Sequence, residues 1–175
     1  MPKSSFEQIN RDEKKILQEI KKNANNSINA IAKKFNFSRQ KVWRIIKKLE
    51  KEKTIWGYTA IMNEEKYGTK KFYVLIKRSN MPLDKEIAKK IIYRHLEEKS
   101  SEIDVIIETS IYVHGEYDWI IIIEAEDITK AKQFTEMLNK LYQGYIDEIH
   151  VLQILFPIKV HGIMNPDKEN LEKFV

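Results

Sequence analysis

The sequence contains no cysteine, and it has few helix- and strand-breaking residues, with five glycines and four prolines among 175 residues. The lack of cysteine excludes a disulfide scaffold, a thiolate metal site and a cysteine nucleophile. No apolar run approaches the ~18 residues that a membrane helix needs, and the first residues lack the apolar stretch of a signal peptide. We therefore expect a soluble, cytoplasmic protein.

Signatures of catalysis are also missing. The four histidines, His95, His114, His150 and His161, do not have the spacing of metal ligands. The sequence has neither a glycine-rich phosphate loop nor a Gly-x-Ser-x-Gly elbow. A cluster of glutamates at residues 97–102 is typical of a solvated helix end. We predict a protein that is not an enzyme and that needs no metal or cofactor.

Charge is distributed unevenly along the chain. Residues 1–54 hold 15 Lys+Arg and 6 Asp+Glu, a balance of +9, whereas residues 55–175 hold 16 and 20, a balance of −4. A basic segment joined to a mildly acidic one is typical of a nucleic-acid-binding module attached to a separate domain. A lysine-rich solvated surface is the alternative, but it would spread lysine evenly.

Apolar spacing predicts three short helices in the basic segment. The first runs from about Arg11 to Lys22, with Asn10 as its N-cap. Ser27 caps a short second helix, residues 36–37 form a turn, and Ser38 caps a third helix that extends to about Lys51. A short helix, a tight turn and a longer helix have the proportions of a helix-turn-helix motif.

The third helix has an apolar stripe and an opposite, basic face. A recognition helix needs this arrangement, because residues in its first turn reach base edges while flanking cations hold phosphates. An ordinary amphipathic helix with a solvated basic face is the alternative, and for Trp43 burial in a core or an interface is as good an account as DNA contact. The predicted DNA-binding residues are Arg39, Gln40, Lys41, Trp43, Arg44, Lys47 and Lys48.

The pattern changes after Thr54. Residues 55–61 are rich in β-forming residues and predict a strand or wing, and residues 63–68 read as a hinge. Strand and helix then alternate in the order β-α-β-β-α-β, which is the ferredoxin-like arrangement of an antiparallel sheet with both helices on one face. The predicted elements are strand 71–77, helix 83–99, strands 103–114 and 119–125, helix 128–142 and strand 146–159.

An antiparallel sheet with helices on one face leaves the other face open. The runs of consecutive apolar residues at 105–107 and 120–123 allow burial on both faces of the sheet. A homodimer formed through the open face is the simplest way to bury it.

Together these pieces resemble the prokaryotic leucine-responsive/AsnC (feast/famine) family of transcription regulators. The resemblance covers residues 6–160. Its motifs are Ile9-Asn10-x-x-Glu13, Ser38-x-x-x-Val42-x-x-x-Ile46, Ile55-x-Gly57-Tyr58 and Gly115-x-Tyr117-Asp118. It implies dimers that often assemble into octamers, binding of palindromic sites in double-stranded DNA, and response to an amino acid or related small molecule.

The resemblance also implies an effector site at Gly115, Tyr117 and Asp118. A tight β-turn whose glycine and aspartate serve only the backbone is the alternative reading of these residues. Two positions depart from the family pattern. Ile45 stands where members often carry arginine, and residues 146–157 lack the threonine or serine that commonly contacts the effector.

We therefore predict a winged helix-turn-helix domain at residues 1–60, a linker at 61–70, a ferredoxin-like sensing and oligomerisation domain at 71–160 and a tail at 161–175. The predicted function is a sequence-specific DNA-binding transcription regulator. The alternative is a DNA-compacting protein with little sequence preference. Residues 165–167 are expected to cap a short terminal helix.

Overall fold

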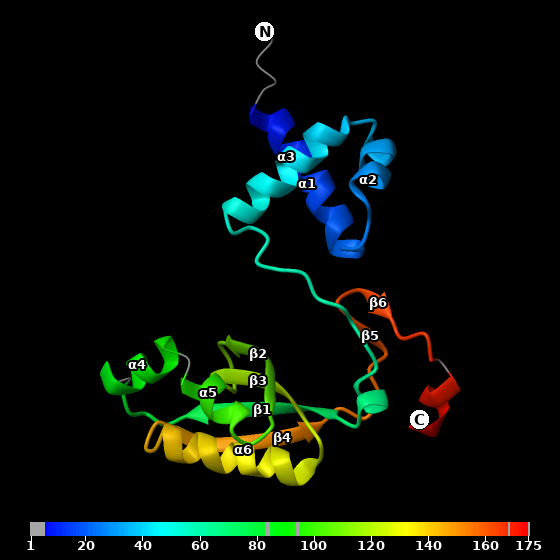
Figure 1. Cartoon of the computed structure of the whole chain (residues 1–175). Helices are drawn as coiled ribbons and strands as arrows, with labels where there is room; N and C mark the ends of the chain where they lie inside the picture. Colours follow the sequence, from blue (N-terminus) through cyan, green and yellow to red (C-terminus); the bar gives the residue numbers. More distant parts are fainter. Residues whose placement is uncertain (1–5, 83–84, 94, 168, 175) are drawn as a thin grey trace. The chain divides into compact units, whose positions relative to one another are not determined.

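The chain forms two compact units. The computed structural model describes residues 6–82, 85–93, 95–167 and 169–174 (Figure 1). One unit comprises the residues up to Ile61 together with Ile158–Pro166, and the other comprises Met62–Pro157 and the residues from Asp167 onward. None of the helices in these described ranges is long and apolar enough to cross a membrane.

The N-terminal unit is built from three helices, α1 (Phe6–Lys22), α2 (Ile28–Phe35) and α3 (Arg39–Lys51). Their apolar faces meet in one core, and each apolar position recurs at the three- to four-residue spacing of a helix face. The fully or nearly buried members are Ile16, Ile20, Ile31, Ala32 and Val42. The three predicted helices are thus confirmed.

One predicted cap is wrong. Helix α1 already includes Phe6, so Asn10 lies inside the helix and does not cap it. Residues 6–9 extend the helix in the N-terminal direction, so its N-terminus lies before Asn10. The predicted caps Ser27 and Ser38 are confirmed, and each accepts a hydrogen bond from the backbone N–H three residues later.

The segment after α3 departs from the predicted strand. Residues 54–63 have no regular secondary structure, although Ile55 packs against the helical core. Trp56 is 94% exposed. Strand-forming residues need a partner strand to complete their hydrogen bonds, and within the described residues none pairs with this segment.

Close to the C-terminus, the N-terminal unit also contains a small hairpin of β5 (Lys159–Val160) and β6 (Ile163–Met164). Its two-residue turn, His161-Gly162, has positive φ at both positions, +47° and +88°, as a type I′ turn requires. The predicted long final strand is therefore too long: β4 (Ile146–Gln153) ends six residues before the hairpin begins.

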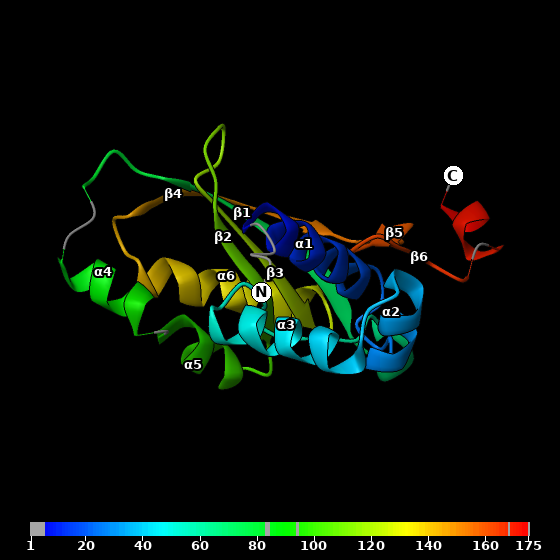
Figure 2. The same cartoon turned by 90° about the horizontal axis from the view of Figure 1, so that it is seen from above.

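The C-terminal unit contains a four-stranded sheet of β1 (Lys70–Arg78), β2 (Ile106–Tyr112), β3 (Trp119–Ala125) and β4, in the order β2-β3-β1-β4. Every neighbouring pair is antiparallel. This order and the intervening helices confirm the predicted α+β, ferredoxin-like fold. Figure 2 shows the connection between β2 and β3 as a loop that extends past the ends of these two strands.

All three helices of this unit lie on one face of the sheet: α4 (Lys85–Ile92), α5 (His95–Ser101) and α6 (Ile128–Leu141). The strand residues that alternate toward them are buried, as Phe72, Val74 and Ile76 show for β1. They pack with Phe134 and Leu138 of α6 in one core. The alternation places the other half of each strand on the opposite face.

The predicted single helix at residues 83–99 is wrong, since α4 ends at Ile92 and α5 starts at His95. Leu83, the predicted first residue, lies outside the described residues. No glycine or proline marks the break. Leu96 and Ser100 of α5 are buried, with Leu96 in the core. Helix α5 therefore packs in the core as a helix separate from α4.

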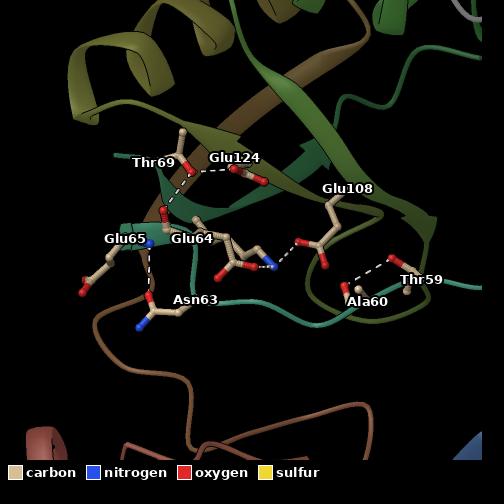
Figure 3. A network of polar contacts seen from close by, with 9 residues as sticks. Thr59, Ala60, Asn63, Glu64, Glu65, Thr69, Glu108 and Glu124 are labelled. Atoms are coloured by element: carbon tan, nitrogen blue, oxygen red, sulfur yellow. Dashed lines mark hydrogen bonds and ion pairs between the residues drawn. The ribbon is translucent and has the colours of Figure 1, made fainter. Parts of the chain in front are cut away.

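A short helix, η1 (Glu64–Tyr67), leads into β1 and is bound to the sheet by charge (Figure 3). The Lys71 ammonium lies 2.5 Å from a Glu64 carboxylate oxygen and 2.8 Å from one of Glu108. The Lys71 side chain is only 17% exposed and that of Glu64 14%. Burial lowers the pKa of Lys71, but the hydrogen bonds that its ammonium donates to Glu108 and Glu64, together with their negative charges, outweigh this effect and raise the pKa overall.

Glu108 lies where the register between β2 and β3 shifts, between Ile107 and Thr109. Ile106 is opposite Glu124, which is opposite Lys71, so the alternation of β2 places Glu108 on the same face as Lys71. The neighbouring Thr69 hydroxyl donates to a carboxylate oxygen of Glu124 on β3, as Figure 3 shows. These contacts fix the start of the C-terminal unit.

The end of the chain also returns to this unit. The short helix η2 (Glu169–Lys173) follows the hairpin, and the Phe174 ring lies 5.9 Å from that of Phe156. The predicted terminal helix is thus present as the short 3₁₀ helix η2, and Phe174, which follows it, contacts the segment after β4.

Lys71→Met should destabilise the C-terminal unit by about 2–3 kcal/mol, because it leaves the buried Glu64 carboxylate without its cation. Lys77→Met is the matched control, since its ammonium and Glu148 are about half exposed and 3.4 Å apart, and it should cost less than about 1 kcal/mol. Denaturant unfolding followed by the fluorescence of the buried Trp119 measures both. Equal losses would contradict the role of Lys71.

Candidate nucleic-acid interface

The turn between α2 and α3 sets where α3 begins. Asn36 adopts the left-handed conformation, with φ of 54°, and its N–H closes the last turn of α2. Ser38 then caps α3 through the Lys41 N–H. The first turn of α3 thus begins with Arg39 and Gln40, both of which are exposed.

One face of α3 carries exposed side chains without internal ion pairs. Arg39 and Arg44 have no ion pair to any described residue, and the Trp43 side chain is 51% exposed. With 100° per residue, Arg39, Trp43, Gln40 and Arg44 span one arc of the helix in that order. Val42 and Leu49 are buried on the opposite side. This exposed arc combines two guanidinium groups, an amide and an indole.

The predicted lysines have a different environment. The Lys41 ammonium lies 2.6 Å from the Asp12 carboxylate, whose side chain is only 4% exposed, and 4.0 Å from the centre of the Phe37 ring. The Lys48 ammonium lies 2.6 Å from Glu13. Both acids are on α1. Lys41 and Lys48 therefore hold α1 against α3.

Lys47 pairs within its own helix, at 2.7 Å from Glu50. Hydrogen bonds from Lys47 and then from Tyr58 lower the pKa of Glu50. The Tyr58 contact, at 3.1 Å, connects α3 to the segment that follows it. The Glu13 hydrogen bond raises the pKa of Lys48, so Lys48 stays charged at neutral pH.

The structure adds Lys51 to the predicted interface and shows what Ile45 contacts. Lys51, at the end of α3, is exposed and lies on the same arc as Gln40 and Arg44. The helical spacing alone could have identified it. Ile45 packs against the helical core, so the arginine of this turn that faces solvent is Arg44.

The predicted effector residues lie in the β2–β3 connection of the other unit. Both carboxylate oxygens of Asp118 face Arg78: one accepts from the Arg78 backbone N–H at 3.0 Å, and the other lies 3.4 Å from the guanidinium Nε. The Asp118 N–H donates to the Ile76 carbonyl oxygen at 3.0 Å. Asp118 therefore ties this connection to the end of β1.

The other two predicted residues have separate surroundings. The Tyr117 ring meets the His150 ring edge-on, with centroids 5.7 Å apart. Gly115 and Asp118 both line a polar hollow of about 390 Å³ beside residues 77–82. In the described part of the chain, no group of three histidine or acidic side chains is placed to hold a metal ion.

Comparison with known proteins relates both units to regulators. A model of the winged helix-turn-helix DNA-binding family matches residues 10–55. An AsnC family transcriptional regulator from Agrobacterium tumefaciens has a TM-score of 0.63 and 20% identity, over 90% of this chain and 97% of that one. LrpC from B. subtilis has a TM-score of 0.60 and 21% identity, over 85% and 95%.

A third solved structure, a transcriptional regulator from Neisseria meningitidis in complex with L-Met, has a TM-score of 0.64 and 16% identity, over 91% of this chain and 97% of that one. No curated protein matches the sequence significantly. Identities of this size show a shared fold, and the fold confirms the resemblance to the leucine-responsive/AsnC regulators.

Lys41→Met should destabilise the helical unit by about 1–2 kcal/mol, because it removes the cation beside the buried Asp12 carboxylate. Lys47→Met removes an exposed pair within one helix and should cost less than about 0.5 kcal/mol. Amide hydrogen exchange of α1 and α3 measures both effects. Unchanged exchange in Lys41→Met would show that this pair does not hold the helices together.

Proposed function

We propose that this protein is a sequence-specific DNA-binding transcription regulator that reads DNA through α3. The observation that carries the proposal is the exposed arc of α3, where Arg39, Gln40, Trp43 and Arg44 face solvent and the two arginines form no ion pair with a described residue. The family model matched to residues 10–55 supports it.

The roles on α3 follow from side-chain geometry. Arg39 and Gln40 stand in the first turn, where a recognition helix reaches base edges, and each can make two hydrogen bonds to one base. Trp43 supplies an apolar surface for a thymine methyl group or a sugar. Arg44 and Lys51 bind phosphates. Lys41, Lys47 and Lys48 add positive potential while they keep their internal pairs.

The proposed roles are assigned to successive segments of the chain. Residues 1–60 bind DNA, residues 61–70 link, and residues 71–160 assemble the protein and sense a small molecule through Gly115, Tyr117 and Asp118. Residues 161–175 form the tail. L-Met is the ligand named for the Neisseria regulator, which supports modulation by a small molecule here.

Assembly through the open face of the sheet fits its composition. Tyr73 and Leu152 are opposite each other in the β1–β4 register, and Ile111 is opposite Ile120 in the β2–β3 register. All four alternate away from the helices, and Tyr73, Ile111 and Leu152 are among the exposed large apolar residues. A two-fold dimer would bury this face. It would also set two recognition helices about 34 Å apart, or a multiple of that distance.

Arg39→Ala and Arg44→Ala should each weaken binding to the preferred site about tenfold or more, and Arg39→Ala should also relax the preference for one base. Lys14→Ala is the charge control, because Lys14 is exposed on α1, and it should change affinity by less than about threefold. The preferred site comes from selection of genomic fragments at two salt concentrations.

The outcome also separates the two proposed functions. A regulator should bind its site about 10³-fold or more tightly than random duplex. Recovery of unenriched fragments with steep salt dependence would instead establish a DNA-compacting protein. Equal affinities of the Arg39→Ala and Lys14→Ala variants would refute the recognition role of α3.

Tyr73→Glu should convert the dimer to a monomer, because it places a charge in the middle of the open sheet face. The side chain is 38% exposed in the single chain, so the unit should still fold. Ile163→Glu, on the hairpin, is the control and should leave the dimer intact. Light scattering coupled to size-exclusion chromatography gives the mass, and a dimer of Tyr73→Glu would place the interface elsewhere.

A further inference from the structure

A second feature of the C-terminal unit is a cleft of about 510 Å³ between α4, the end of β1 and the base of the β2–β3 connection. Its lining includes Arg78 and Asp118 together with Tyr112 and Tyr145. Ala88 and Ile91 of α4 supply an apolar wall. Arg78 and Asp118 also line the hollow beside Gly115, so the cleft shares these two residues with the proposed effector site.

The polar groups of this cleft are mainly hydrogen-bond donors. Arg78 has five N–H donors on its guanidinium, and only Nε faces the Asp118 carboxylate, at 3.4 Å. Both oxygens of Asp118 already face Arg78. The terminal nitrogens of Arg78 therefore keep donors for a further partner, whereas the acidic group of the cleft is engaged.

The two tyrosines add to the donors. A hydrogen bond between Tyr145 and the guanidinium is the largest cause of a raised pKa of Arg78. Since the guanidinium can only donate, the phenol oxygen accepts, and its O–H is left to donate elsewhere. Desolvation raises the pKa of Tyr112 to about 12, so this hydroxyl also carries its proton at neutral pH. His114, exposed beside them, can donate or accept.

We propose that this cleft binds a small organic monocarboxylate with an apolar body and no ammonium group. The carboxylate would accept from the terminal nitrogens of Arg78 and from the Tyr145 hydroxyl, in the two-pronged geometry that guanidinium and carboxylate share. The apolar body would lie along Ala88 and Ile91. An ammonium group would have to compete with Arg78 for both oxygens of Asp118.

For its regulatory meaning this inference rests on the proposed function, because the ligand would be the effector. Ligand binding itself is measured on the full chain without DNA. Failure of ligand binding is thus distinguishable from failure of DNA binding. The probes are 3-phenylpropanoate and 4-methylpentanoate. Each is compared with the amino acid of the same skeleton, L-phenylalanine or L-leucine, and with its own uncharged amide.

Isothermal titration at neutral pH should show binding of at least one carboxylate, with the matching amide and amino acid about tenfold weaker or more. Arg78→Gln should weaken the carboxylate about tenfold or more, whereas Lys77→Gln, the neighbouring cation on the other side of β1, should not. Ala88→Leu should block the cleft by filling it. Arg78 and Ala88 are not in the buried core, and thermal unfolding checks that each variant is folded.

Three results would overturn the proposal. Equal binding of the amide would show that Arg78 does not anchor an anion. Equal or tighter binding of the amino acid would assign an ammonium subsite to Asp118 and replace the ligand class. Absence of binding by both carboxylates would show that the cleft does not take this class.

Discussion

A ferredoxin-like sheet covers only one of its faces with its own helices, and much of this protein's design follows from that constraint. Phe72, Val74 and Ile76 of β1 are buried against α5 and α6. The other half of each strand carries apolar side chains such as Tyr73 and Leu152. In a chain that is one third charged, an uncovered apolar face of this kind favours self-association. In the proposed regulator, self-association would supply the pair of recognition helices that a palindromic site requires.

In the helical unit the described ion pairs separate cations that hold the helices together from cations that are available to a partner. Asp12 and Glu13 on α1 engage Lys41 and Lys48 on α3, so these lysines lose side-chain freedom in the free protein. Arg39 and Arg44 have no such pair among the described residues, and both are exposed. From the sequence we predict Arg39, Gln40 and Arg44 as base or phosphate contacts and Lys41, Lys47 and Lys48 as supporting cations. The ion pairs of Lys41 and Lys48 are consistent with a supporting role.

Much of the fold could be predicted from periodicity and capping alone. The apolar spacing of α1 to α3, the serine caps and the β-α-β-β-α-β order all depend on local sequence. Predictions that depend on long-range packing were less accurate. Residues 55–61 have strand-forming side chains but no partner strand. The break between α4 and α5 has no local signal and follows from the burial of Leu96.

The site residues also divide into those that local spacing predicts and those that depend on long-range contacts. Helical spacing was enough to place Arg39, Gln40, Trp43 and Arg44 on one arc, and it would also have found Lys51. It could not foresee that Lys41 meets a buried Asp12, because that contact joins residues 29 positions apart. The contact between Lys71 and Glu108 is of the same kind, since it joins two strands, β1 and β2, that are far apart in the sequence.

The β2–β3 connection joins two independent observations about the ligand. The last strand lacks the threonine or serine that the family resemblance implies for an amino-acid effector. The structure shows that Asp118, the residue best suited to an ammonium group, instead orients Arg78. A site that lacks hydroxyl partners and whose carboxylate already binds Arg78 offers fewer polar contacts to a zwitterion. The same arrangement leaves guanidinium and phenol donors facing an apolar wall, and a carboxylate without an ammonium group is the chemistry that satisfies them.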